Sequence, residues 1–186
     1  MSGPPVAGDV KASQARNFDT LNEVLGATSF DTHLRFLNYG YALLPGEEPV
    51  GPTIGPLFPN ADAARMLFQL VGDLSLDGLD VVDVGCGRGG NLWLLGRHHH
   101  PRLAVGLDVA ASSVQLVGAR VPTARGVVGD AERLPLADGS VDVVLSVEYP
   151  RAELDPSEVR DAVDVLSFYA DKYVAQITEL SAVPEA

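Results

Sequence analysis

Residues 81–90, VVDVGCGRGG, lead from an apolar run of strand character through a glycine-dense turn into a segment of helical character. Glycine lets the backbone turn tightly and approach a ligand without a Cβ atom, and the following helix start adds main-chain N–H donors. The stretch therefore predicts a cradle for a small molecule. Gly85, Gly87 and Gly90 also fit the dinucleotide spacing G-x-G-x-x-G, so the loop alone does not identify its cofactor.

The composition predicts one soluble globular domain. The chain has 186 residues, of which 46% are hydrophobic, and its net charge is -12. No run approaches the roughly 18 apolar residues of a membrane helix, and no export signal is visible, so we expect no membrane association. The single cysteine, Cys86, forms no internal disulfide, which fits a reducing cytoplasm. The acidic balance argues against a nucleic-acid partner, because phosphate binding needs concentrated Lys and Arg.

Three regions are predicted along the chain. Residues 1–60 combine a disordered lead to about residue 15, a short helix, and a loop or lid that holds five prolines and three glycines between Pro45 and Pro59. Residues 61–150 form an α/β core, whose first helix is capped by Asn60 or Asp62 and reaches Val71. Residues 151–186 form a helical segment.

From Leu79 onward, short apolar runs of strand character alternate with helical segments. Nearly continuous apolar strands separated by helices indicate a parallel sheet covered on both faces, and so a doubly wound α/β fold. Ligands in such sheets bind outside the carboxyl ends of the strands. The polar residues that end successive strands are therefore the functional candidates, and they are Asp83, Asp108, Asp130 and Glu148.

Two of these carboxylates point to adenosine. Asp108 lies 23 residues after Gly85, where a carboxylate binds the ribose of either NAD or S-adenosylmethionine. Asp130 can accept a hydrogen bond from an exocyclic amine, while the backbone amide of Ala131 can donate to a ring nitrogen. The third strand end therefore favours an adenine in the cleft.

The ordered motifs resemble those of a known family. DVGCGRGG (83–90), GLD ending at Asp108, and GDAERLPLADGSVDVVLSVE (129–148) resemble the successive motifs of class I S-adenosylmethionine-dependent methyltransferases. RFLNYGY (35–41) is similar to the N-x-G-Y segment before the core of bacterial small-molecule methyltransferases, including lipid and polyketide O- and C-methylating members. The resemblance implies a Rossmann-like sheet of the methyltransferase type and S-adenosylmethionine as cofactor.

The resemblance also implies a set of cofactor-binding residues. The methionine portion would lie at the glycine loop, the ribose at the second strand end and the adenine at the third, and the set comprises Asp83, Gly85, Cys86, Gly87, Gly89, Asp108, Val109, Asp130, Ala131 and Glu148. Cys86 is most simply a small filler of the loop. Glu148 either contacts the methionine amine or the substrate, or merely ends a strand. A rim of carboxylates suits a cationic sulfonium better than a pyrophosphate.

The acceptor side is less defined by the sequence. Methyl transfer is direct attack by a substrate nucleophile, so the chain needs no nucleophile of its own. Asn38, Tyr39 and Tyr41 either line the substrate mouth or serve packing. His33, Tyr39 and Glu148 are the candidate catalytic groups, with His33 either a general base or structural. His98–His100 are consecutive and point in different directions, so no metal site is predicted.

The segment after Glu148 departs from the family pattern. Only 38 residues follow it, so we expect a sheet truncated after about the fourth strand and then a long amphipathic helix capped by Asp155. Its apolar seam is Val159, Val163, Leu166, Ala170, Tyr173, Ile177 and Leu180. This helix packs on its own sheet or forms a homo-oligomer interface. A fifth strand within residues 172–180, KYVAQITEL, ranks lower, because polar residues interrupt it.

Three functions remain after the sequence is read. The leading hypothesis is S-adenosylmethionine-dependent methyl transfer to a small-molecule acceptor that resembles a natural product or a lipid. The second is a non-catalytic S-adenosylmethionine-binding or assembly subunit, which the short carboxyl end favours. The third is an NAD-dependent oxidoreductase, supported by the glycine spacing and Asp108 but opposed by the adenine-reading segment after the third strand.

Overall fold

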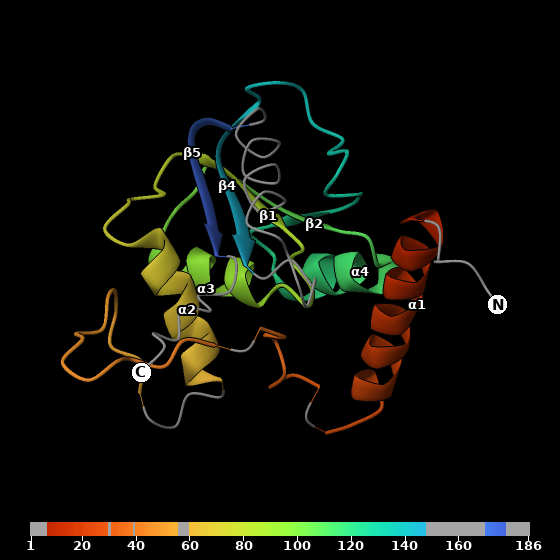
Figure 1. The fold of residues 1–186 in the computed structure, drawn as a ribbon, viewed down its shortest axis with the longest axis horizontal. Coiled ribbons are helices and arrows are strands. Elements are labelled where there is room, and N and C mark those ends of the chain that lie inside the picture. Colours follow the sequence, from red (N-terminus) through yellow and green to blue (C-terminus); the bar gives the residue numbers. More distant parts are fainter. Residues whose placement is uncertain (1–6, 30, 39, 56–59, 148–169, 178–186) are drawn as a thin grey trace, which may run out of the picture.

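The computed structural model describes residues 7–29, 31–38, 40–55, 60–147 and 170–177. The described strands form one parallel sheet with helices packed along it (Figure 1). In chain order the elements are α1 (Ala7–Gly26), α2 (Ala61–Val71), β1 (Asp80–Val84), α3 (Gly90–His98), β2 (Leu103–Asp108), α4 (Ala111–Arg120), β3 (Arg125–Val128), β4 (Val141–Val147) and β5 (Ala170–Ile177).

The strand order is β3-β2-β1-β4-β5, and every pairing is parallel. At the centre of the sheet, Val82 of β1 pairs with Val105 on one side and with Val144 on the other. The chain winds outward from β1 through β2 to β3, then crosses back to β4 on the opposite side. This reversal defines a doubly wound sheet and confirms the predicted fold class. It also creates the switch point at the carboxyl ends of β1 and β4, where such folds bind ligands.

Apolar packing on both faces explains why β1 and β4 are nearly continuous runs of valine and leucine. On one face, Val81 and Val143 are buried in a cluster with Leu67 of α2 and Leu94 of α3. On the other face, Val82 belongs to a cluster that includes side chains of the connection between β3 and β4. Helices α3 and α4 share a third cluster that rests on β2. The sheet is thus held from both sides within the described residues.

Helix α1 is longer than the sequence predicts. It begins at Ala7, so the expectation of a disordered lead to about residue 15 is wrong for residues 7–15. Helix α1 packs against α4 (Figure 1) through polar contacts rather than an apolar seam. Asn22 Nδ2 donates to Ser112 Oγ at 2.9 Å and to Ser113 Oγ at 3.1 Å. Tertiary hydrogen bonds of this kind leave no periodic apolar pattern in the sequence, which explains why the predicted helix is shorter than α1. Among the described residues, no helix has the length and apolar character that a membrane span requires.

The proline- and glycine-rich segment before α2 is irregular, as predicted, over its described part, and it is tied to that helix. Tyr41 Oη donates to Glu47 Oε1 at 2.6 Å, and Gln69 Nε2 of α2 donates to the same oxygen at 2.9 Å. A Cβ atom on Gly51 would lie 2.9 Å from the Phe68 side chain, so the backbone lies directly against α2 there. Asn60 occupies the position before α2 with a φ of 60°, but its side chain makes no capping hydrogen bond.

The end of the sheet differs from the prediction. The described sheet continues to a fifth strand, one beyond the predicted end after about the fourth. The helix predicted over residues 170–177 is wrong, because β5 pairs with β4 there and joins Val143 to Tyr173 and Val147 to Ile177. Without β5, one edge of β4 would leave main-chain N–H and C=O groups unpaired. Pairing with β5 satisfies these groups. The spacing of apolar side chains by three and four residues, which suggested a helix, carries no information about these main-chain hydrogen bonds.

The lower-ranked alternative, a fifth strand within residues 172–180, is the one that the structure supports over residues 172–177. Tyr173 and Ile177 therefore belong to a strand and not to a helical seam. The other seam residues outside β5, Val159, Val163, Leu166 and Leu180, lie outside the described residues. The homo-oligomer interface predicted through this helix stays a prediction for the seam residues outside β5.

Candidate functional site

The glycine loop begins at the carboxyl end of β1 and is tied to the end of β2. The amides of Gly85 and Cys86 both donate to the Leu107 carbonyl oxygen, at 2.8 and 3.0 Å. Gly85, Gly87 and Gly89 have φ values of 73°, 49° and 79°, in the left-handed region that favours glycine. The loop is therefore a tight turn built at the switch point of the sheet, as the sequence predicts.

The three glycines serve different purposes. A Cβ atom on Gly85 would meet none of the described residues within 4 Å, and one on Gly87 would lie 3.7 Å from Leu37 Cδ1. A Cβ atom on Gly89, by contrast, would lie 3.1 Å from Val117 Cγ2 on α4. Gly85 and Gly87 thus leave space that a ligand can occupy, whereas Gly89 allows the loop to pack on α4. The contact of Gly89 with a cofactor stays a prediction.

Alanine substitution separates these roles. We expect Gly89→Ala to lower the free energy of unfolding by about 3 kcal/mol, because it adds a steric conflict with Val117 to the strain of a positive φ. Gly85→Ala carries the backbone strain alone and should cost about 1 kcal/mol. Urea unfolding of both variants measures the difference. Equal losses in the two variants would show that Val117 does not constrain the loop.

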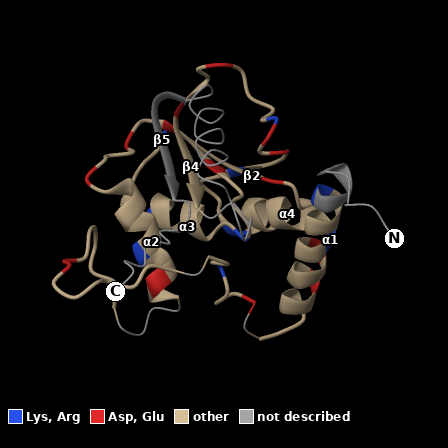
Figure 2. Ribbon diagram, in the orientation of Figure 1, with Lys and Arg blue, Asp and Glu red and all other residues tan. Residues whose placement is uncertain are grey.

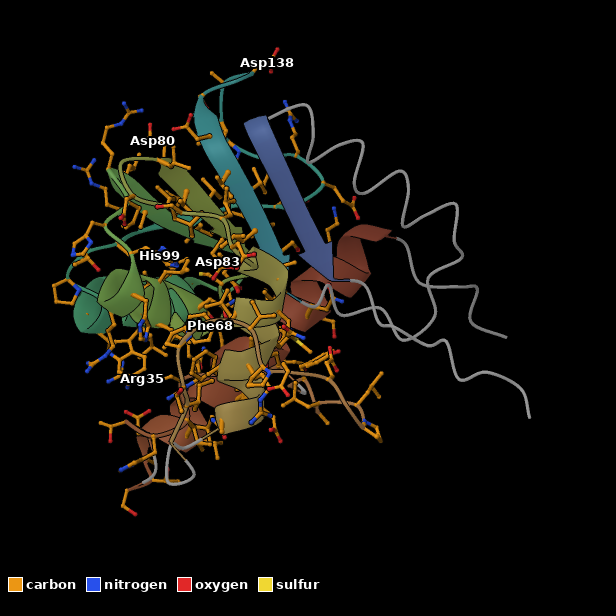
Figure 3. The ribbon with its side chains drawn as sticks, turned by 90° about the vertical axis from the view of Figure 1, so that its left-hand side faces the viewer. Arg35, Phe68, Asp80, Asp83, His99 and Asp138 are labelled. Carbon is orange, nitrogen blue, oxygen red and sulfur yellow. The ribbon has the colours of Figure 1, made fainter. Side chains whose placement is uncertain are left out.

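Asp83 is the buried carboxylate beneath the loop (Figure 3). Its side chain is fully buried, and Oδ1 accepts a hydrogen bond of 3.4 Å from Asn91 Nδ2 on α3. Among the residues that the structure describes, neither Asp83 Oδ2 nor Asn91 Oδ1 has a hydrogen-bond partner. Burial raises the pKa of Asp83 to about 7. Asn91 was not a sequence candidate, because a polar residue in the first turn of a helix gives no signal that its side chain bonds to the strand before the glycine loop.

Asp108 reaches the glycine loop from the end of β2. Its Oδ2 accepts a hydrogen bond from the Gly87 amide at 2.9 Å, and its Oδ1 accepts one from the Ala110 amide at 2.8 Å. Burial raises the pKa of Asp108, and the two amide hydrogen bonds act in the opposite direction. Its neighbour Val109 is an exposed apolar side chain. The structure thus brings Asp108 and the loop together, as predicted.

Asp130 follows β3, directly beside Asp108 in space. The Gly129 amide donates to the Asp108 carbonyl oxygen at 3.0 Å, which joins the second and third strand ends. Asp130 Oδ1 accepts a hydrogen bond from the Glu132 amide at 3.0 Å, and Asp130 Oδ2 accepts one from Lys11 Nζ at 2.6 Å. Lys11 comes from α1 and was not a sequence candidate, because its segment was predicted to be disordered.

Arg88, the basic residue of the loop, points away from the ligand side. Its side chain is buried, and its guanidinium donates to Leu34 O at 2.6 Å, to Asn22 Oδ1 at 2.7 Å and to Asp31 Oδ1 at 2.5 Å. Asp31 also pairs with Arg120 of α4. Burial alone would raise the pKa of Asp31, but the guanidiniums of Arg88 and Arg120 outweigh this effect and hold the pKa below its usual range. Arg88 therefore ties the loop to α1 and the segment after it.

The Cys86 side chain faces the protein interior. It packs in a cluster with Leu92 and Val117, and burial raises the pKa of its thiol. A buried thiol with a raised pKa is a poor nucleophile, which agrees with the interpretation of Cys86 as a filler. Only its backbone can contribute to a ligand site.

The acceptor-side candidates that the structure describes have separate local contacts. Tyr41 donates its hydroxyl to Glu47, and His33 is exposed with Nδ1 3.4 Å from Thr32 Oγ1. Asn38 Oδ1 is buried without a hydrogen-bond partner. Tyr39 and Glu148 lie outside the described residues. Their roles on the acceptor side stay predictions.

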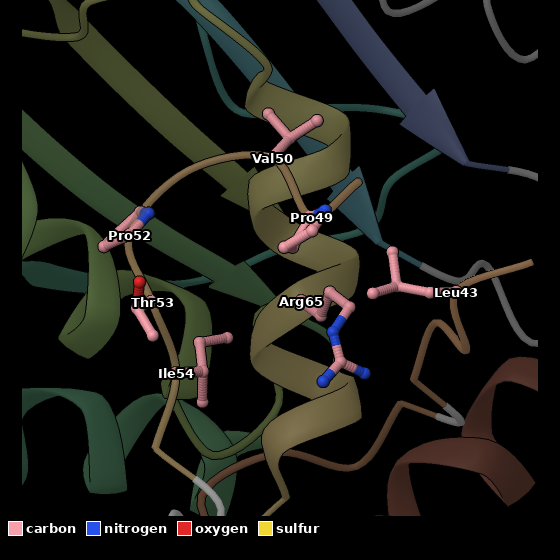
Figure 4. Close-up of a pocket in the computed structure, with 7 residues that line it drawn as sticks. All are labelled: Leu43, Pro49, Val50, Pro52, Thr53, Ile54 and Arg65. Carbon is pink, nitrogen blue, oxygen red and sulfur yellow. The ribbon is translucent and has the colours of Figure 1, made fainter. Parts of the chain in front are cut away.

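A small cavity of about 100 Å³ lies between α2 and the segment before it (Figure 4). It shares no lining residue with the glycine loop or with the three strand-end carboxylates, and it is lined by Leu43, Pro49, Val50, Pro52, Thr53, Ile54 and Arg65. Its lining is mainly apolar, and Arg65 donates to Asp62 and to the Tyr41 carbonyl oxygen. The cavity is therefore separate from the candidate cofactor site.

Comparison with known proteins agrees with this geometry. The model of the methyltransferase domain family matches residues 81–167. A phthiotriol/phenolphthiotriol dimycocerosates methyltransferase of Mycobacterium ulcerans is 37% identical over 118 residues, which are 62% of this chain and 42% of that protein. A fatty-acid O-methyltransferase of Mycolicibacterium smegmatis is 34% identical over 139 residues, which are 69% of this chain and 48% of that protein. The chain thus spans about half the length of these curated relatives.

Solved structures show the same fold. Geranyl diphosphate C-methyltransferase from Streptomyces coelicolor A3(2) has a TM-score of 0.61 at 20% identity, with 90% of this chain and 64% of that chain covered. The [4+2]-cyclase SpnF has a TM-score of 0.60 at 20% identity, with 91% of this chain and 58% of that chain covered. The ordered motifs, the strand order and the family match agree. The chain belongs to the class I S-adenosylmethionine-dependent methyltransferase family.

Proposed function

We propose that the glycine loop and the three strand-end carboxylates bind S-adenosylmethionine, and that the bound cofactor methylates a small, lipid-like acceptor. The observation that carries the proposal is the unpaired Oδ2 of Asp83, fully buried beneath a loop whose Gly85 leaves open space. A buried carboxylate oxygen without a donor is costly. The ammonium group of the methionine portion has three N–H donors and a positive charge, which suit this oxygen.

The charges of the site favour S-adenosylmethionine over NAD. A pyrophosphate needs N–H donors or cations, but Asp83 and Asp108 present carboxylates at the loop. Arg88 is the basic residue in the loop, and its guanidinium is engaged by Leu34, Asn22 and Asp31. Since a pyrophosphate would meet negative charge without a compensating cation, the oxidoreductase hypothesis loses support.

Each strand end would hold one part of the cofactor. Gly85 and Gly87 allow the loop backbone to approach the methionine portion, and Asp108 accepts hydrogen bonds from the ribose hydroxyls. Asp130 and the Ala131 amide would read the adenine, against which the exposed apolar side chain of Val109 can pack. The cofactor supplies an electrophilic methyl group. The chain would contribute alignment and exclusion of water.

The acceptor class rests on the relatives. Those matched include a fatty-acid O-methyltransferase and phthiotriol/phenolphthiotriol dimycocerosates methyltransferases, so we propose a lipid-like or natural-product acceptor in secondary metabolism. Asn38 and Tyr41 are the described candidates to line its entrance, and His33 is the described candidate for a general base. A cytoplasmic setting is proposed from the lone Cys86, because reducing compartments do not favour disulfides.

Transfer of a radiolabelled methyl group tests the proposal. The chain is incubated with S-[methyl-³H]adenosylmethionine and a panel of long-chain fatty acids and hydroxylated lipids, and label is counted in the organic extract. We expect label to enter at least one acceptor, and Asp108→Ala to reduce the incorporation at least about tenfold, since it removes charged hydrogen bonds to the ribose.

Two results would revise the proposal in different ways. Cofactor binding without transfer to any acceptor would support the alternative of a non-catalytic binding subunit. Transfer that Asp108→Ala leaves unchanged would show that the cofactor does not use the end of β2.

A further inference from the structure

We propose that Lys11 of α1 is a positioning residue for adenine recognition: it holds Asp130 so that the carboxylate accepts a hydrogen bond from the exocyclic amine. This inference rests on the proposed function, and it names a residue outside the family motifs. It concerns which base the site accepts and not the chemistry of methyl transfer.

Lys11 fixes the Asp130 carboxylate from one side while the chain fixes it from the other. Lys11 Nζ lies 2.6 Å from Asp130 Oδ2 and 2.5 Å from Glu132 Oε2. The Glu132 amide donates to Asp130 Oδ1 at 3.0 Å. Each oxygen of Asp130 thus has one donor, and each can accept one more. The Asp130 side chain is 39% exposed, which leaves it accessible to a ligand.

Helix α1, which carries Lys11, is held in place by hydrogen bonds to α4 and to the glycine loop. Eight residues further along the helix, Asp19 Oδ1 accepts a hydrogen bond from the Ser112 amide at 3.1 Å. Asn22 bonds to α4 and accepts a hydrogen bond from Arg88 of the glycine loop at 2.7 Å. A lysine on an anchored helix loses less freedom on pairing than one on a free segment. Lys11 is therefore placed by the same contacts that hold the glycine loop.

Two charged side chains of α1 act on the strand-end carboxylates in opposite ways. Lys11 reaches Asp130, and the negative charge of Asp19 acts on Asp108. Acidic residues occur along α1 and on several loops, with basic residues scattered among them (Figure 2). Since the chain carries a net charge of -12 and only two lysines, a lysine between two carboxylates is a specific placement and not one of many.

The pairing selects for an amine. With Lys11 present, Asp130 is held ionised and accepts hydrogen bonds only, because Lys11 and the Glu132 amide lower the pKa of Asp130 against the effect of burial. Adenine offers an N–H donor to this oxygen, whereas hypoxanthine carries an oxygen atom at the same position and would be repelled. Without Lys11, Asp130 and Glu132 repel each other, and the Asp130 carboxylate loses the contact that orients it.

The test compares two ligands that differ at this edge of the base: S-adenosylhomocysteine and S-inosylhomocysteine, in which oxygen replaces the exocyclic amine and the neighbouring ring nitrogen N1 carries a proton. Calorimetry gives the ratio of their dissociation constants for the intact chain and for Lys11→Met, Asp130→Asn and Arg16→Met. Arg16→Met is the matched control, because it removes an exposed cation from the same helix.

We expect the intact chain and Arg16→Met to prefer S-adenosylhomocysteine to the same degree. Lys11→Met should reduce this preference about threefold, the effect of a partly exposed ion pair. Asp130→Asn should reduce it further than Lys11→Met does, because an amide can donate to the hypoxanthine oxygen.

Three results would overturn the inference. If the preference is unchanged in Lys11→Met, Lys11 does not position Asp130. If both ligands weaken equally while circular dichroism shows α1 intact, Lys11 has a structural role only. If the intact chain binds neither ligand, the proposed function fails, and this inference fails with it.

Discussion

Replacing Arg88 with methionine is expected to lower the free energy of unfolding by about 3–5 kcal/mol, the range found when one partner of a buried ion pair is removed. The guanidinium is buried and donates to Leu34 O, Asn22 Oδ1 and Asp31 Oδ1, three acceptors on segments far from the glycine loop in sequence. Methionine fills similar space but donates to none of them. The loss is large compared with the 5–15 kcal/mol that stabilises a typical domain.

Chemical denaturation followed by circular dichroism measures this loss, with Arg102→Met as the control. Arg102 pairs with Asp80 through two hydrogen bonds of 2.8 and 2.7 Å, but its side chain is 68% exposed. An exposed pair contributes little, so the control should lose less than about 1 kcal/mol. Similar losses in the two variants would mean that the buried network around Arg88 does not hold the glycine loop to the segment after α1.

Asp83→Asn is expected to have opposite effects on stability and on cofactor binding. Burial raises the pKa of Asp83 to about 7, so at pH 8 the folded chain carries a buried charge there, and its removal should make the ligand-free protein more stable. The same substitution removes the negative charge that, in the proposed site, would face the methionine ammonium. Binding of S-adenosylhomocysteine should therefore weaken at least about tenfold. Asp83 would then lower the stability of the ligand-free protein and strengthen cofactor binding.

The pH dependence follows from the direction of the pKa shift. Between the usual value of 3.8 and about 7, the folded chain holds a proton on Asp83 that the unfolded chain has released. Raising the pH through this window therefore lowers the free energy of unfolding, by a few kcal/mol at most, and the loss is complete above pH 7. Asp83→Asn lacks this loss.

The difference in melting temperature between Asp83→Asn and the intact chain should thus be larger at pH 8 than at pH 5. Scanning calorimetry at both values measures it, and the comparison of two proteins cancels the titration of the other groups. A difference that is equal at both pH values would show that Asp83 titrates normally in the folded chain.

The sequence predicted those parts of the site that depend on local order. Apolar runs that end in Asp83, Asp108 and Asp130 indicate strands whose carboxyl ends meet, and the structure joins the ends of β2 and β3 through Gly129. The glycine turn is equally local, since Gly85 and Gly87 need only a positive φ and an open side. Both signals lie within a few residues of the feature that they predict.

The fifth strand was misread because its partner is distant in sequence. Residues 170–177 carry apolar residues at a spacing that suits a helix, but the strand is stabilised by main-chain hydrogen bonds to β4. Those bonds depend on β4 having an unpaired edge, which the sequence of residues 170–177 does not encode. A polar edge strand also lacks the continuous apolar run by which buried strands are recognised.

The contacts of Arg88 and Lys11 were missed for the same physical reason. Arg88 meets Asn22 and Asp31 across 66 and 57 residues, and Lys11 meets Asp130 across 119 residues. A long polar side chain can point toward a ligand or into the protein, and only the fold decides which. Sequence reasoning therefore named the carboxylates of the candidate site but not the cations that contact the segment after α1 and Asp130.

The central claim is that this glycine loop selects S-adenosylmethionine and not a dinucleotide. Isothermal titration calorimetry of the intact chain with S-adenosylhomocysteine, and of the same preparation with NAD, tests it most directly. We predict saturable binding of one S-adenosylhomocysteine per chain and no heat from NAD at the same concentrations. Binding of NAD in place of S-adenosylhomocysteine, or of neither ligand, would contradict the assignment.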